Sequence, residues 1–235
     1  MERDNLTAPV IACSRLRMQT DGKGVTTLVC FHGCPLRCQY CINPFSFDPA
    51  TKRADMTAKM LYEEVRRDEL YFLATGGGVT FGGGEPLLYA PFLNEFRQIC
   101  GDGWHLCAET SLAVPWENVQ TAAGCVDMFF VDCKDTDPEV YRRYTGRGNE
   151  RMLDNLRKLS ELIGPQRIVV RLPLIPGFNT EQHRQKSHTL LTSIGVKQFD
   201  LFSYRVERKK TSMPTAGNSE TPSGNTGGSI SCKIV

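Results

Sequence analysis

Residues 26–41 read TTLVCFHGCPLRCQYC, a β-branched and apolar run that leads directly into a loop with three cysteines. A run of this length and composition predicts a buried strand over residues 26–31. Strands that are apolar on both faces are typical of parallel sheets covered by helices. This stretch therefore predicts an α/β protein whose chemistry begins where its first such strand ends.

The same alternation of strands and helices continues along the chain. Further strands are predicted over 79–81, 105–110, 128–131, 167–174 and 198–204, and helices over 57–74, 90–100, 115–122, 149–163 and 180–193. Six such repeats fit a partial (β/α)6 barrel of parallel strands or an open doubly wound sheet. In both arrangements ligands gather at the C-terminal ends of the strands.

The composition suits one domain with short flanking segments. The chain has 235 residues, of which 40% are hydrophobic, enough to bury a core. We predict an N-terminal extension over 1–18, a core domain over 19–204 and a tail over 205–235. The tail begins with basic residues and continues with Ser, Thr, Gly, Asn and Pro, so we expect it to be largely disordered.

Charge and hydropathy exclude several classes of partner. The net charge is only +2, which gives no general electrostatic attraction to nucleic acid or to an anionic membrane. No apolar run approaches the roughly 20 residues that span a bilayer. The polar N-terminus shows no signal peptide, so a cytoplasmic location is expected. In a reducing compartment, clustered cysteines bind metal more often than they form disulfides.

The cysteine loop has the spacing C-x3-C-x2-C at Cys34, Cys38 and Cys41. Three thiolates on one loop can hold three irons of a cubane cluster and leave the fourth iron open for a small molecule. Cys30 could instead close the site as a fourth ligand of an iron–sulfur cluster or of zinc. The other six cysteines are scattered, and four of them are predicted to pack as small apolar residues: Cys13, Cys100, Cys107 and Cys125. Cys133 is excepted from this prediction, and Cys232, in the tail, is predicted to be a free, exposed thiol.

Five motifs in this order resemble the radical S-adenosylmethionine (radical SAM) enzymes, and more closely the activating enzymes of glycyl radical enzymes. They are CPLRCQYC (34–41), GGVTFGGGEP (77–86), DCK (132–134), YTG (144–146) and PLIPGFN (173–179). The resemblance covers roughly residues 19–204. It implies the partial (β/α)6 barrel and one 4Fe-4S cluster with an open iron. No second group of cysteines follows Cys41, which favours the short form without a ferredoxin-like insert.

The resemblance also assigns residues to S-adenosylmethionine (AdoMet). It implies that Gly83, Gly84 and Glu85 lie against the methionyl amine, that Lys134 faces the carboxylate and that Tyr40 lines the adenine pocket. The full set of expected AdoMet-binding residues is Tyr40, Gly83, Gly84, Glu85, Asp132 and Lys134, with Arg171 and His183 as further candidates. A monovalent cation would be held by Glu109, Thr110 and Asp132. Glu109 stands where the family has Asp, one methylene shorter.

The implied activity is that of an oxidoreductase. The cluster reductively cleaves AdoMet to a 5′-deoxyadenosyl radical, which abstracts hydrogen from a glycine of a partner glycyl radical enzyme. A flavodoxin or ferredoxin would supply the electron, and the chain is expected to act as a monomer. Two alternatives stay open. One is a radical SAM enzyme that acts on a small molecule, and the other is a non-catalytic iron–sulfur or zinc protein with Cys30 as fourth ligand.

Overall fold

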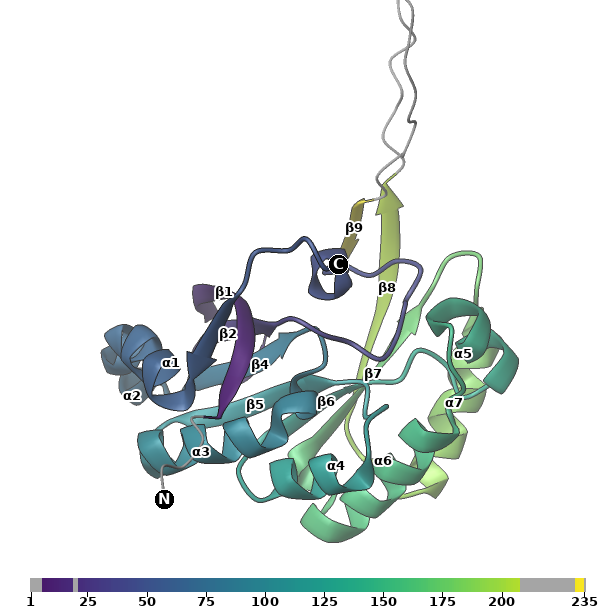
Figure 1. The fold of residues 1–235 in the computed structure, drawn as a ribbon. Helices are drawn as coiled ribbons and strands as arrows, with labels where there is room; N and C mark the ends of the chain where they lie inside the picture. The colour runs from purple at the N-terminus through teal and green to yellow at the C-terminus, as the bar shows by residue number, and fades with distance from the viewer. Residues whose placement is uncertain (1–5, 19–20, 208–230, 235) are drawn as a thin grey trace, which may run out of the picture.

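The computed structural model describes residues 6–18, 21–207 and 231–234, which build one nine-stranded sheet flanked by helices (Figure 1). The strand order is β3-β1-β2-β4-β5-β6-β7-β8-β9. The strands are β1 (Thr7–Met18), β2 (Val25–Phe31), β3 (Ala54–Thr57), β4 (Gly78–Gly83), β5 (His105–Thr110), β6 (Met128–Asp132), β7 (Ile168–Leu174), β8 (Phe199–Glu207) and β9 (Ser231–Ile234).

The centre of the sheet consists of six parallel strands, β2, β4, β5, β6, β7 and β8. This arrangement confirms the predicted α/β fold with six parallel strands. Side chains such as Val79, Phe81, Leu106 and Phe129 are fully buried, as continuous apolar strands require. β1 and β3 extend one edge in antiparallel fashion, and β9 extends the other. All six central strands therefore end at the same rim.

The helices cover the sheet and leave this rim to loops. They are α1 (Ala58–Val65), α2 (Glu69–Thr75), α3 (Ala90–Cys100), α4 (Trp116–Ala123), α5 (Pro138–Thr145), α6 (Glu150–Ile163) and α7 (Glu181–Ser193). In Figure 1, α3, α4 and α6 lie side by side along one side of the sheet. Each buries an apolar stripe at helical spacing, for example Phe92, Leu93 and Phe96 of α3.

The predicted helix over 57–74 is wrong in one respect, because two helices replace it. α1 ends at Val65, a 3-10 turn over Arg66–Asp68 follows, and α2 then begins. The carboxylate of Asp68 accepts hydrogen bonds from Arg15 Nε (2.9 Å) of β1 and from Thr27 Oγ1 (2.9 Å) of β2. The turn lets this buried carboxylate reach two strands, which one straight helix would not require.

The flanking segments differ in part from the sequence prediction. Within the predicted N-terminal extension, Thr7–Met18 forms β1 and pairs with both β2 and β3. At the other end β8 runs to Glu207, and Ser231–Ile234 pairs with it as β9 although we predicted disorder there. An exposed edge such as that of β8 presents unpaired backbone groups that recruit a further strand. Residues 208–230 and 235 lie outside the described residues.

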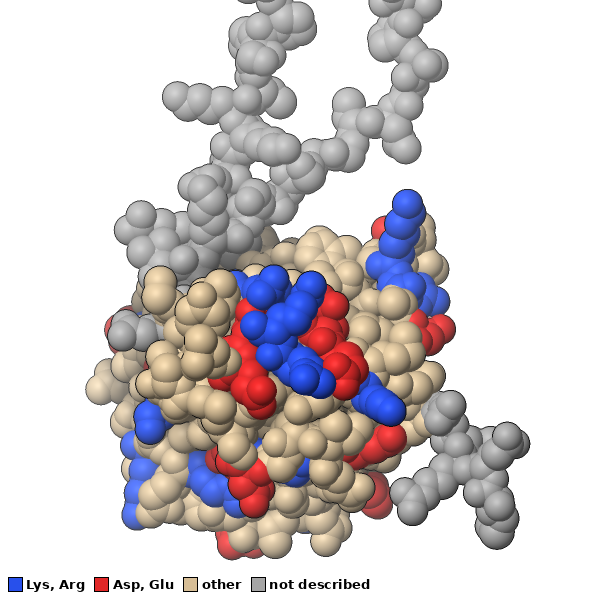
Figure 2. Space-filling model, turned by 90° about the vertical axis from the view of Figure 1, so that its left-hand side faces the viewer, with Lys and Arg blue, Asp and Glu red and all other residues tan. Residues whose placement is uncertain are grey.

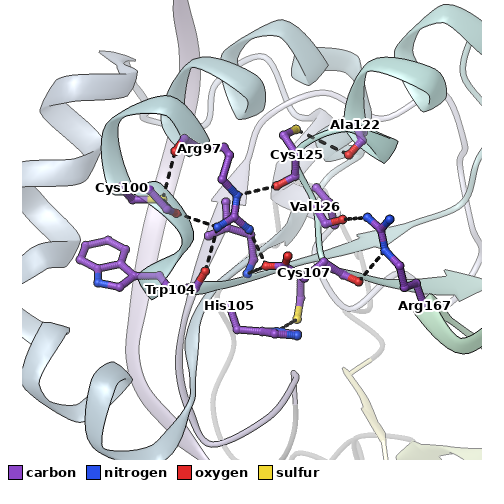
Figure 3. Close-up of polar contacts among 12 residues, drawn as sticks. Arg97, Cys100, Trp104, His105, Cys107, Ala122, Cys125, Val126 and Arg167 are labelled. Atoms are coloured by element: carbon purple, nitrogen blue, oxygen red, sulfur yellow. Dashed lines mark hydrogen bonds and ion pairs between the residues drawn. The ribbon is translucent and has the colours of Figure 1, made fainter. Parts of the chain in front are cut away.

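Two arginines fasten the end of the sheet opposite the rim (Figure 3). Arg97 of α3 donates from Nε to the Cys125 carbonyl (2.9 Å) and from one terminal nitrogen to the Trp104 carbonyl (3.0 Å). Arg167 donates to the carbonyls of Ala123 and Val126. Buried carbonyls at strand and helix ends must find donors, and these guanidinium groups supply them. The nearby cysteines, including Cys125, pack at this end and not at the rim.

The face over α1 and α2 carries charges of both signs side by side (Figure 2). Arg66 pairs with Glu63 at 3.0 Å and Arg67 with Glu64, each three residues apart and half exposed. Such exposed pairs contribute little stability. This face therefore shows no basic patch that would attract nucleic acid. None of the helices in the described part of the chain is both long and apolar enough to cross a membrane.

Replacing Asp68 with Asn should lower the free energy of unfolding by roughly 1–3 kcal/mol, because Arg15 and Thr27 lose a charged acceptor. The hydrogen bond from Arg15 is the main reason that the pKa of Asp68 lies below its usual value. The ionised carboxylate therefore stabilises the fold above about pH 4, and this contribution is lost as the pH falls through the folded-state pKa.

Urea unfolding of the wild type and of Asp68→Asn at pH 7 and near pH 3 measures this difference. It should shrink in acid, and exposed Asp102→Asn serves as the control. A difference that is equal at both pH values would contradict the assignment.

Candidate active site

The cysteine loop follows β2 and is held by the backbone of α5. The amide of Arg37 donates to the Thr145 carbonyl (2.8 Å), and the amide of Gln39 donates to the Tyr144 carbonyl (3.0 Å). α5 begins with Asp137 as its cap and ends at Gly146 in the left-handed conformation. The loop therefore docks onto the last carbonyls of a helix, which need donors from outside the helix.

The glycines after β4 allow a second backbone contact to the cysteine loop. The Gly84 amide donates to the Phe31 carbonyl (2.9 Å), and the Glu85 amide donates to the Gly33 carbonyl (2.8 Å). A Cβ added at Gly84 would lie 2.2 Å from the Gly33 oxygen, and Gly83 has a positive φ of 83°. Only glycine permits this approach. The motif predicted to contact AdoMet thus also fixes the start of the loop.

The carboxylate of Glu85 accepts hydrogen bonds from several groups of the protein itself. Thr110 Oγ1 donates to one carboxylate oxygen (2.7 Å), and the amide and hydroxyl of Ser111 donate to the other (2.8 and 2.6 Å). The amide of Leu87 also donates to Glu85 (3.2 Å). Burial raises the pKa of Glu85, and the bonds from Ser111 and Thr110 counter this rise. The expected contact of Glu85 with the methionyl amine stays a prediction, since the carboxylate joins β4 to the end of β5.

Lys134 lies buried just beyond the end of β6, beside a cysteine of the loop. Its Nζ donates to Asp132 Oδ2 (3.0 Å) and to the Tyr204 hydroxyl (3.1 Å). Burial would lower the pKa of Lys134, but Asp132 and Tyr204 outweigh this effect and hold it well above its usual value. Burial raises the pKa of Cys38, and the positive charge of Lys134 partly counters this rise. The structure thus places a charged ammonium at the rim, next to the predicted cluster site.

The expected cation site is only partly assembled. Arg171 of β7 binds Glu109 at 2.8 Å, and its guanidinium lies 4.9 Å from the centre of the Phe130 ring. The Thr110 hydroxyl is bonded to Glu85. The charge of Arg171 also helps lower the pKa of Asp132. The carboxylates predicted to bind a cation thus already face a guanidinium, because Glu109 of β5 and Arg171 of β7 meet across the intervening strand β6.

The remaining AdoMet candidates have partners within the chain. The Tyr40 ring packs against Tyr144 (6.1 Å) and Phe178 (5.6 Å), and its hydroxyl donates to the Pro176 carbonyl (3.3 Å). This places Tyr40 among aromatic side chains at the rim. His183 hydrogen-bonds through Nδ1 to Thr180 Oγ1 (2.8 Å) at the start of α7. This local contact gives no support for a ribose ligand.

Asn179 joins two of the predicted motifs at the rim. Its amide nitrogen donates to the Pro173 carbonyl (3.0 Å), to Asp135 Oδ2 (3.2 Å) and to the Lys134 carbonyl (3.4 Å). Its side-chain oxygen accepts from the Ile175 amide (2.6 Å). The side chain therefore fixes the loop after β7 to the segment that carries Lys134.

The three thiols of the loop fit a polynuclear iron cluster. Burial, together with the negative charge of Glu85, raises the pKa of Cys34 to about 12. Burial also raises the pKa of Cys38 to about 11. Metal binding must therefore displace protons from the thiols. In the described ranges 6–18, 21–207 and 231–234, no three His, Cys, Asp or Glu side chains converge on one metal ion. A cubane needs no such convergence, because each thiolate binds a different iron, whereas a zinc site does.

Cys30 has different surroundings from the loop cysteines. After burial, the charges that act most on its thiol are those of Glu109 and Arg17. The Cys34 thiol is influenced instead by Cys38 and the third cysteine of the loop. Cys30 also lies inside β2 with a buried side chain, whereas Cys34, Cys38 and Cys41 lie on the loop beyond the strand, which favours three-cysteine ligation over the alternative with Cys30 as a fourth ligand.

Several residues of the site escaped sequence analysis. Tyr204 was read only as the end of a strand, yet it binds Lys134. The helix α5, which holds the cysteine loop, was not predicted either, although Asp137, Pro138 and Gly146 are ordinary signals for the start and end of a helix. The signal that could have revealed this helix was therefore present in the sequence.

The chain is similar to known proteins in sequence and in fold. Residues 28–186, more than half of the chain, match the radical SAM superfamily. A (2S)-3-sulfopropanediol dehydratase activating enzyme from Klebsiella oxytoca is 31% identical, over 68% of this chain and 69% of the relative. A pyruvate formate-lyase-activating enzyme from Staphylococcus aureus is 32% identical, over 78% of this chain and 76% of the relative.

Among solved structures, Streptococcus suis SuiB bound to S-adenosylmethionine superposes with a TM-score of 0.58 at 14% identity. The match covers 79% of this chain and 41% of SuiB. At this identity the likeness concerns the fold alone.

Replacing Gly84 with Ala should prevent normal loading of iron, because the new Cβ would collide with the Gly33 carbonyl and displace the cysteine loop. Iron and sulfide content after anaerobic reconstitution measures this. Gly124→Ala is the matched control, since its Cβ would meet only the Thr121 carbonyl at an ordinary 3.5 Å. Equal loading of both variants would show that the close contact is not required.

Proposed function

The chain belongs to the radical SAM superfamily, and we propose that it is an activating enzyme that generates a radical on a glycine of a partner protein. The observation that carries this proposal is the pairing of a three-thiol loop, Cys34, Cys38 and Cys41, with a buried ammonium, Lys134, at one rim of the barrel. The two curated relatives named as activating enzymes support the choice of branch.

The family implies a 4Fe-4S cluster and AdoMet, and the residues of the rim fit both. The three thiols would hold the cluster, which when bound supplies one electron to the sulfonium of AdoMet. Lys134 would bind the methionyl carboxylate as a charged hydrogen-bond donor. The backbone of Gly83 and Gly84 would lie against the methionyl group, as the family implies.

AdoMet and the glycine are then both substrates of a balanced reaction. The electron cleaves the C5′–S bond, which gives methionine and the 5′-deoxyadenosyl radical. This radical takes one hydrogen atom from the glycine Cα, which gives 5′-deoxyadenosine and leaves the unpaired electron on the partner. The electron would come from a flavodoxin or ferredoxin, and the chain would act as a monomer. No acid or base of the rim is required to move a proton.

A monovalent cation is less well supported than the cluster. Arg171 already compensates Glu109 at 2.8 Å, and the Thr110 hydroxyl is bonded to Glu85. We propose that the guanidinium supplies the positive charge at this point of the rim. Reconstituted protein should then bind AdoMet equally well in sodium, potassium and tetramethylammonium buffers.

A radical SAM enzyme for a small molecule is the second candidate. The same rim would serve it, because AdoMet cleavage makes no demand on the final hydrogen donor. The candidates differ in the substrate that loses hydrogen, so the decisive measurement must detect a radical on a protein.

The test is anaerobic reconstitution followed by EPR of the reduced protein with and without AdoMet, with 5′-deoxyadenosine measured in the same samples. We expect AdoMet to change the cluster signal and to be cleaved. Cys34→Ala, Cys38→Ala and Cys41→Ala should each abolish both effects, whereas Cys30→Ala should retain them. A spectrum that ignores AdoMet in fully loaded protein would refute the radical SAM activity in this chain.

Addition of a candidate partner then separates the two functions. Pyruvate formate-lyase and (2S)-3-sulfopropanediol dehydratase are the first to try, since the relatives' names point to them. A glycyl radical EPR doublet on the partner supports the activating enzyme. AdoMet cleavage that leaves every tested glycyl radical enzyme unlabelled would favour the small-molecule candidate.

Replacing Lys134 with Met should raise the Kd for AdoMet about 10- to 100-fold, because a charged hydrogen bond worth roughly 1.5–3 kcal/mol is lost. Isothermal titration of the reconstituted protein measures this change. Lys158→Met, on the surface of α6, should leave the Kd unaltered. An unchanged Kd in Lys134→Met would remove this lysine from the AdoMet site.

A further inference from the structure

The side chain of Lys134 reaches across the rim of the barrel to Tyr204 on another strand. Lys134 follows β6, whereas Tyr204 belongs to β8, and β7 lies between these two strands in the sheet. Lys134 Nζ donates to the Tyr204 hydroxyl at 3.1 Å and to Asp132 Oδ2 at 3.0 Å. The ammonium is thus held from two sides, by a carboxylate of its own segment and by a phenol 70 residues further along the chain.

One donor of this ammonium has no partner within the described part of the protein. A lysine ammonium carries three N–H donors, and Asp132 and Tyr204 use two of them. In residues 6–18, 21–207 and 231–234, no third acceptor lies within hydrogen-bond distance of Nζ. The Lys134 side chain is only 9% exposed. A buried charge that keeps an unused donor at the rim suits a carboxylate ligand.

The Tyr204 ring is fixed independently of its contact with the lysine. It belongs to a buried cluster with Tyr144 and Ile175, and Cys38 of the cysteine loop packs against this cluster. The preceding residue, Ser203, is paired with β7. The hydroxyl is therefore a fixed acceptor close to the cysteine loop, whereas a lysine side chain is a flexible four-carbon stem.

Asp132 alone would not define where the ammonium lies. It stands only two residues from Lys134, and its side chain is 31% exposed. One hydrogen bond fixes a distance but not a direction, so a second contact from another strand is needed to define the position of Nζ. Tyr204 supplies this second contact.

The phenol holds the ammonium without cancelling its charge. Burial raises the pKa of Tyr204 above its usual value, and the charge of Lys134 partly counters this rise. The hydroxyl is therefore protonated and neutral at neutral pH. The positive charge of Lys134 is compensated by Asp132 and remains able to attract an anionic ligand.

We propose that Tyr204 is a positioning residue for AdoMet, whose hydroxyl holds Lys134 Nζ so that the unused N–H points at the methionyl carboxylate. This inference rests on the proposed function, because it requires AdoMet at this rim with its carboxylate on Lys134. Tyr204 acts through the lysine and needs no contact of its own with AdoMet. Its hydroxyl should therefore affect AdoMet binding only while Lys134 is present.

The experiment measures the Kd for AdoMet by isothermal titration of the full chain loaded with its cluster. Tyr204→Phe keeps the ring and removes the hydroxyl, so the Kd should rise about 5- to 10-fold. Tyr62→Phe is the matched control, because this ring stacks on Trp104 (5.2 Å), which precedes β5 at the end opposite the rim. Its Kd should equal that of the wild type. An unchanged Kd in Tyr204→Phe, or an equal rise in the control, would overturn the proposal.

A double-mutant cycle separates positioning from an independent or structural effect. If the hydroxyl acts through Lys134, adding Tyr204→Phe to Lys134→Met should change the Kd by no more than about 2-fold. Independent contributions would instead multiply, so that the double variant shows the product of the two single effects. That outcome would refute the inference, because Tyr204 would then act without the lysine.

The iron content of Tyr204→Phe completes the test. It should equal that of the wild type after reconstitution, since the ring and its packing remain. Failure of this variant to load its cluster would also overturn the proposal, because the hydroxyl would then serve the fold or the cluster instead of AdoMet. A wild type that loads its cluster but does not bind AdoMet would instead refute the proposed function.

Discussion

The close backbone contact between the end of β4 and the start of the cysteine loop is the constraint on which the rest of the site depends. Two hydrogen bonds, from the amides of Gly84 and Glu85, hold residues 31 and 33 at a distance that leaves no space for a Cβ. Because backbone groups make this contact, it does not use the thiols of the loop. The last carbonyls of α5 hold the middle of the loop in the same way. The Arg37 side chain adds a hydrogen bond to the Cys34 carbonyl (2.6 Å), so the loop that carries the three thiols is fixed at both its start and its middle.

Charge balance is the second constraint at the rim. Lys134 is paired with Asp132, and Arg171 on the adjoining strand is paired with Glu109. Buried charges are tolerated only when they are compensated, so the four groups form a nearly neutral set.

The fold was largely predictable because its central strands are continuous apolar runs. The six parallel strands lie within a few residues of their predicted bounds, since burial on both faces marks them in the sequence. The helix α5 was not predicted because its eight residues, PEVYRRYT, are mostly polar and too few to show a helical period. β1 escaped because its charged residues resemble a loop, and its pairing with β2 becomes visible only in the sheet.

The sequence by itself determined the family and predicted the cluster ligands, because Cys34, Cys38 and Cys41 share one short loop and their spacing is a local property. Tertiary structure alone decided that Glu85 binds Thr110 and that Arg171 binds Glu109. These contacts join residues that lie 25 or more positions apart. Local spacing cannot encode them, since they follow from which strands become neighbours and in what register they align.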